Sequence, residues 1–98
     1  KKEKSIILKI KNNKNKIIKE KNIKNEITKY EIIITSIIEI LNENEKKLDE
    51  FSIQENGIFS VASQHSQSVT NEKKLITLLS KSLAEKIVKE ILIRYNDI

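Results

Sequence analysis

The sequence predicts an α+β domain: an antiparallel meander of about three strands, covered by one long C-terminal helix to form a two-layer sandwich. Three observations predict this fold. Runs of apolar, β-branched residues recur through the first 60 residues, and one of them, Ile27–Leu41, alternates with period two. Polar stretches rich in Asn separate these runs at spacings typical of hairpins. From residue 70 onward the apolar period changes to 3.6, which is the period of a helix.

The first strand is expected at Ser5–Ile10, because its residues are mostly apolar and β-branched. The polar stretch Lys11–Lys16 (KNNKNK) then predicts a turn. Ile17–Glu20 resumes an extended run, either as the return arm of that turn or as a continuation past a bulge.

The clearest strand is Ile27–Leu41, which alternates with period two. One face carries Tyr30, Ile32, Ile34, Ile38 and Ile40, and the other carries Glu31, Thr35 and Glu39 together with Ile33 and Ile37. One helix covers only one face, so Ile33 and Ile37 are candidate partner contacts. A further element of the domain, or an isoleucine-rich outer face produced by biased composition, remains an alternative.

A polar turn at Asn42–Lys47 and a third strand at Leu48–Ser60 complete a hairpin, in which we expect Gly57 to allow a bulge or bend. The helix should begin near Thr70 or Asn71, either of which can cap it, and run about 24 residues to Arg94–Asn96. Its apolar stripe is Ile76, Leu79, Leu83, Ile87 and Ile91, widened by Leu75, Ala84, Val88, Leu92 and Tyr95.

Composition excludes several classes of site. The 98 residues suffice for one domain, and they include no Cys, no Pro and only one Gly. Thiolate metal sites, cysteine nucleophiles and Gly-rich phosphate loops are therefore excluded. The only histidine, His65, stands in a polar stretch without a nucleophile signature. The acidic residues around the second turn lack calcium-loop spacing. We expect no catalytic residue, no metal and no cofactor.

The positive charge is concentrated at the start of the chain. Residues 1–26 hold ten Lys and three Glu, whereas residues 27–98 carry a net charge of −2. Clustered lysines attract polyanions, and our candidates for phosphate contacts are Lys14, Lys16, Lys19 and Lys21. The segment lacks the aromatic and Arg side chains that stack nucleic-acid bases. Abundant Ile, Lys and Asn are also what an AT-rich genome produces, so composition alone does not separate function from codon usage.

Three segments in this order resemble the LPS-assembly lipoprotein family, LptE. They are the strand Ile27–Thr35 (ITKYEIIIT), the strand end and loop Gly57–Ser63 (GIFSVAS), and the helix Leu83–Leu92 (LAEKIVKEIL). With the Lys-rich start, the resemblance covers nearly the whole chain. Departures exist, because the family loop usually carries more aromatic residues than Ser60–Ser68.

The resemblance implies a non-catalytic outer-membrane lipoprotein on the periplasmic side. It would plug and help to assemble the LptD β-barrel and take part in lipopolysaccharide transport to the cell surface. Residues 1–98 would then be a single α+β domain that lacks its N-terminal strand and helix, and the membrane anchor would be a lipidated N-terminus that precedes Lys1. The partners would be an LptD-type barrel and lipopolysaccharide, with no nucleic acid.

Two alternatives stay open. A small basic cytoplasmic RNA-binding module is one, and it predicts affinity that falls steeply with salt. A structural interaction module whose isoleucine face joins another protein is the other.

Overall fold

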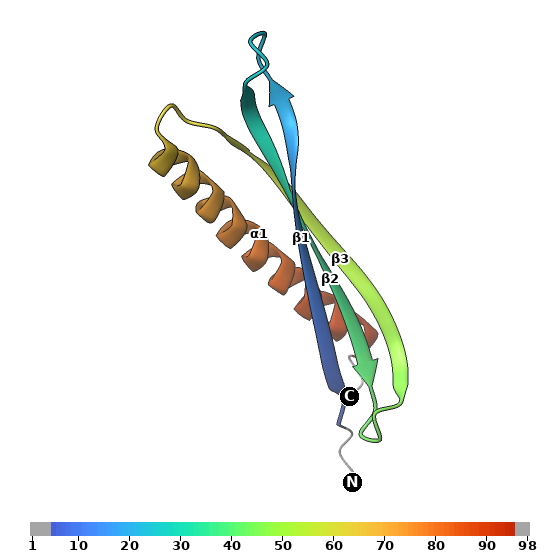
Figure 1. The fold of residues 1–98 in the computed structure, drawn as a ribbon. Coiled ribbons are helices and arrows are strands. Elements are labelled where there is room, and N and C mark those ends of the chain that lie inside the picture. Colours follow the sequence, from blue (N-terminus) through green and yellow to red (C-terminus); the bar gives the residue numbers. More distant parts are fainter. Residues whose placement is uncertain (1–4, 96–98) are drawn as a thin grey trace.

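The computed structural model describes residues 5–95 as a three-stranded antiparallel sheet with one helix on one of its faces (Figure 1). The elements in chain order are β1 (Ile7–Lys21), β2 (Ile27–Leu41), β3 (Lys47–Ser60) and α1 (His65–Arg94). The strands lie in the order β1-β2-β3, so β2 is central. The molecule is a rod with extents of 66 × 19 × 18 Å. The predicted fold class, an α+β meander packed by a C-terminal helix, is confirmed.

β1 is longer than the sequence suggested, because the expected turn at Lys11–Lys16 is wrong. These residues continue one strand and pair in unbroken register with β2 from Ile7 to Ile18. The turn lies instead between Lys21 and Ile27, and the register shifts fall between Ile18 and Lys21. Backbone hydrogen bonds to β2 hold this edge strand without an apolar pattern, and its Lys and Asn residues are exposed.

The core lies between α1 and one face of the sheet. Alternate residues of β2 supply its largest fully buried side chains, the isoleucines Ile32, Ile38 and Ile40. From β3 come Phe51 and Phe59, and from α1 come Leu79, Leu83 and Ile87. These side chains include three members of the predicted helical stripe. Val88 and Leu92, which were expected to widen that stripe, are exposed.

Gly57 does not form the expected bulge. It pairs with Ile32 in regular register, and the shift in this hairpin lies between Ile40 and Leu41. The glycine instead lets α1 approach the sheet, because a Cβ atom at this position would lie 2.7 Å from Cδ1 of Leu75.

The helix begins at His65, several residues before the predicted start. Gln64 precedes it in extended conformation without a side-chain capping bond. Thr70 and Asn71, the predicted caps, lie inside the helix, where Asn71 Nδ2 donates a 3.2 Å hydrogen bond to the carbonyl of Ser60. The additional residues, His65–Val69, are mostly polar and exposed, so apolar periodicity did not reveal them. The helix ends at Arg94, and Asn96 lies outside the described residues.

Candidate functional site

No element of residues 5–95 covers the sheet face opposite α1, and we call it the open face. It carries the side chains of β2 that point away from the core, including Ile33 and Ile37. Ile37 is exposed and Ile33 is half-buried. Their cross-strand neighbours are polar: Asn15 and Asn56 flank Ile33, and Lys11 and Ser52 flank Ile37. Both predicted partner-contact residues thus lie together on this surface, at the centre of the sheet.

The four candidate lysines do not form one cluster, because they are spread along β1 rather than around a turn. Lys14 and Lys16 lie on the side of the sheet that faces α1, where each lines a cavity. Lys19 Nζ is 4.0 Å from Glu31, a residue of the open face. Lys21 ends the strand beside the first turn. A single bound phosphate group therefore cannot contact all four, since Lys14 and Lys21 are seven residues apart, about 23 Å in an extended strand.

A groove of about 400 Å³ runs between β1 and α1, because the helix lies against β3 and β2 and leaves β1 uncovered. Its lining is mostly apolar and includes Ile10, Ile34 and Ala84. One polar pair interrupts it: the Oγ of Ser36, a buried residue of β2, donates a hydrogen bond to Oδ1 of Asn12 on β1. Asn12 thus provides a hydrogen-bond acceptor for Ser36, the one buried polar residue among the isoleucines of β2.

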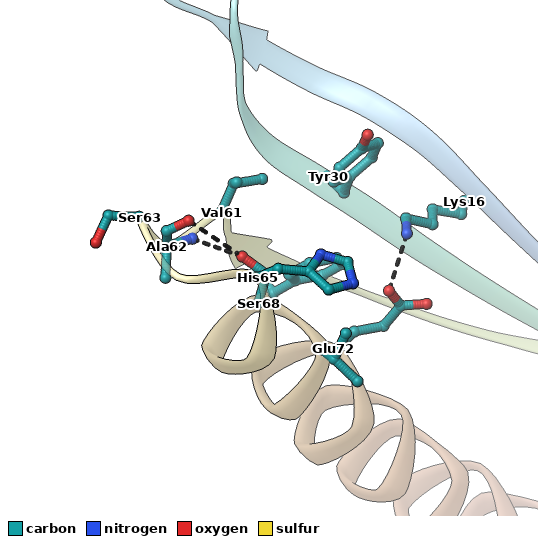
Figure 2. A pocket seen from close by; sticks show the side chains of 10 residues that line it. Lys16, Tyr30, Val61, Ala62, Ser63, His65, Ser68 and Glu72 are labelled. Atoms are coloured by element: carbon teal, nitrogen blue, oxygen red, sulfur yellow. Dashed lines mark hydrogen bonds and ion pairs between the residues drawn. The ribbon is translucent and has the colours of Figure 1, made fainter.

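A second cavity, of about 330 Å³, lies beside the start of α1 (Figure 2). The rings of Tyr30 and Phe59 stack beneath it with centroids 5.6 Å apart. Lys16 Nζ lies 4.5 Å from the centroid of the Tyr30 ring and 2.9 Å from Oε1 of Glu72. Lys16 therefore already has an aromatic and an anionic partner.

His65 lines the same cavity, and within residues 5–95 no hydrogen bond joins it to a serine hydroxyl. The Oγ of Ser68 accepts a 2.8 Å hydrogen bond from the backbone N–H of Ala62. That Oγ also donates a longer bond to the Ala62 carbonyl. The Ser68 hydroxyl thus closes the loop between β3 and α1, as Figure 2 shows.

Ion pairs fix α1 to β3. Arg94 bonds to the carboxylate of Asp49, and this hydrogen bond is the main reason that the pKa of Asp49 lies below its ordinary value. Lys86 bonds to Glu55, and this contact, with a smaller contribution from the hydroxyl of Ser82, lowers the pKa of Glu55. Glu90 and then Asp49 raise the pKa of Arg94. The ion pairs with Asp49 and Glu55 connect α1 to β3, and none of these charged contacts involves a lysine of β1.

All four aromatic residues of the chain lie on the helix side of the sheet. Phe51 and Phe59 are in the core, and Tyr30 and Tyr95 pack against it. Within residues 5–95, no three His, Cys, Asp or Glu side chains are grouped so that they could hold a metal ion. In the same part of the chain, no helix is both long enough and apolar enough to cross a membrane.

The two hairpin turns share a design that sequence reasoning missed. Asn22 Oδ1 accepts backbone hydrogen bonds from Lys24 and Glu26, at 2.9 and 3.0 Å. Asn42 Oδ1 accepts the equivalent bonds from Asn44 and Lys46, both at 2.9 Å. The signal was present, because Asn is the first residue of each turn and Asn commonly begins such turns.

The comparisons with known proteins add no assignment to this geometry. No family model matches the chain, and no curated protein matches it.

Proposed function

We propose that this protein is a non-catalytic component of the bacterial outer membrane, of the LptE type. It would occupy the lumen of an LptD-type β-barrel, help that barrel to assemble, and take part in lipopolysaccharide transport. The observation that carries the proposal is the open face, with Ile33 and Ile37 at its centre and no element of the described chain against it.

The shape of the molecule supports this proposal. Its cross-section is 19 × 18 Å and its length is 66 Å. Barrels of roughly 16 or more strands enclose a lumen, and the largest of them hold a folded plug. A narrow rod with an exposed side along its length can contact the inner wall of such a barrel. The isoleucines and the polar residues beside them would then meet the mixed surface of a barrel interior.

The placement of the aromatic residues favours this proposal over RNA binding. Sheet-based RNA-binding domains stack bases on aromatic side chains of an exposed sheet face. Here Tyr30 and Phe59 lie on the covered side, and the open face offers isoleucine, asparagine and lysine instead. The lysines of β1 retain a role in attracting lipopolysaccharide phosphates, for which stacking is not needed.

Binding to the barrel is tested by co-purification with an LptD-type β-barrel. Replacing Ile33 and Ile37 together by Ser should abolish co-purification. The control is Leu78→Ser, which removes an exposed apolar side chain from α1 and should leave co-purification unchanged. Retention of the double Ser variant by the barrel would remove the open face from the proposal.

Lipopolysaccharide binding is tested separately with Lys14, Lys16, Lys19 and Lys21 replaced by Glu. The matched control replaces four exposed lysines of α1 by Glu: Lys73, Lys74, Lys81 and Lys89. Both variants carry the same net charge, so only a site-specific effect distinguishes them. Unchanged lipopolysaccharide binding by the β1 variant would show that these four lysines do not bind the phosphates. An equal loss of binding in both variants would show that the lysines act only through the net charge of the protein.

The proposed membrane anchor has a direct test. The intact mass of the native protein from its own cells, with fragmentation of the N-terminus, should reveal a cysteine that carries diacylglycerol. A native protein without lipid would contradict the lipoprotein assignment.

A further inference from the structure

The two hairpin turns have the same backbone conformation but different side chains at their tips. In each turn, the side-chain oxygen of the first residue, an Asn, accepts hydrogen bonds from two backbone N–H groups. The fourth residue of each turn has a positive φ, 65° at Asn25 and 63° at Glu45. In each, the backbone N–H groups of the first and fourth residues also form equivalent hydrogen bonds. The side chains at the tips are therefore not dictated by the turn geometry.

At the second position of the turn, the β2–β3 hairpin has Glu43, whereas the β1–β2 hairpin has Ile23. The Ile23 side chain is fully exposed, more so than any other large apolar side chain in the described chain. An isoleucine contributes nothing to a turn that Asn22 and Asn25 already define. Water is the least favourable environment for it.

Lysines surround this apolar tip. Lys21 precedes the turn and Lys24 follows Ile23, and neither forms an ion pair with another described residue. Glu26, the acidic residue of the same turn, accepts a 3.0 Å hydrogen bond from the side chain of Asn22. The tip thus presents one exposed isoleucine between two free ammonium groups. The β1–β2 hairpin lies at one end of the rod (Figure 1).

We propose that the tip of the β1–β2 hairpin docks onto the surface of an anionic lipid bilayer, with Ile23 inserted at the level of the headgroups and Lys21 and Lys24 against lipid phosphates. A bilayer suits this tip better than a protein pocket does. A specific protein interface buries on the order of 1,200 Å² or more, and a tip of three residues offers far less. A bilayer interface accepts a shallow apolar insertion and adds attraction for each nearby lysine. This inference does not depend on the proposed function.

Tryptophan fluorescence provides the test, because the chain contains no Trp. The single Trp of an Ile23→Trp variant should shift to shorter emission wavelengths with vesicles that contain phosphatidylglycerol. Vesicles of phosphatidylcholine alone should leave it unchanged. The control is Leu48→Trp, which places the probe at an exposed position near the acidic turn. Its emission should not respond to either vesicle.

Sedimentation with the same vesicles measures the contribution of each group. Lys21→Gln and Lys24→Gln should each weaken partitioning about fivefold at low salt, and the effect should shrink as salt rises. Ile23→Ser should weaken it several-fold at all salt concentrations. Unchanged emission of the Ile23→Trp variant, or an equal shift in the Leu48→Trp variant, would overturn the proposal. Emission that shifts with a protein partner but not with vesicles would also overturn it, and would leave a protein pocket as the occupant.

Discussion

β1 and β3 flank β2 symmetrically but stand in opposite environments. Tyr30 of β2 lies opposite Ile18 on one side and Phe59 on the other, and Ile38 lies likewise between Ile10 and Phe51. The two phenylalanines are 6% and 9% exposed, whereas Ile18 and Ile10 are 49% and 50% exposed. The difference arises because α1 covers β3 and leaves β1 uncovered. Equal pairing in a sheet therefore does not imply equal burial.

The largest effect should come from replacing an aromatic residue of β3. Phe59→Ala leaves a cavity under α1 and should lower the free energy of unfolding by about 3–5 kcal/mol. Ile18→Ala, across β2 from it, should cost about 1 kcal/mol or less, because half of that side chain is already in water. Urea denaturation followed by circular dichroism measures both. Equal losses would show that β1 is as well packed as β3.

A single polar contact should make β1 more important than its exposure suggests. Asn12→Ala removes the acceptor of the buried Ser36 hydroxyl and should cost about 1–3 kcal/mol. The neighbouring Asn13→Ala on the open face should change stability by about 0.5 kcal/mol or less. In a Ser36→Ala background the effect of Asn12→Ala should shrink, because no buried hydroxyl is left without a partner. An undiminished effect in that background would assign the loss to another contact of Asn12.

The close approach of α1 to β3 predicts a smaller effect at Gly57. Gly57→Ala places a methyl group 2.7 Å from Cδ1 of Leu75, and the Leu75 side chain must move to accept it. We expect a loss of about 1 kcal/mol, at the low end of the cost of overpacking, because Leu75 is flexible. Thermal unfolding of Gly57→Ala, Leu75→Ala and the double variant measures the coupling. Additive losses would indicate that the two residues do not touch.

The sequence predicted β2, β3 and the helical stripe, because burial on one side imposes a period of two or 3.6 on apolar residues. It failed where burial is absent. α1 does not cover β1, so Lys11–Lys16 carries no apolar pattern, and the strand forms because β2 offers it hydrogen-bonding partners. The first turns of α1 are also exposed, so they carry no apolar pattern either. The partner-contact prediction for Ile33 and Ile37 followed from the period, whereas the Asn12–Ser36 pair needs a register that no local pattern specifies.

The smallest expected effect is a dependence of stability on pH, which arises from two carboxylates of β3. Asp49 and Glu55 both have lowered pKa values, because Arg94 and Lys86 of α1 stabilise their charged forms. A group with a lowered pKa contributes stability above its unfolded-state pKa, and that contribution is lost as the pH falls through the folded-state pKa. Docking of α1 on β3 should therefore weaken as the pH falls below the ordinary pKa values of 4.5 for Glu55 and 3.8 for Asp49.

The measurement is the urea midpoint of unfolding at pH 7 and at pH 3. The variant with Asp49→Asn and Glu55→Gln should be less stable than the wild type at pH 7 and closer to it at pH 3. A gap that persists undiminished at pH 3 would mean that the two carboxylates act through packing and not through their charge.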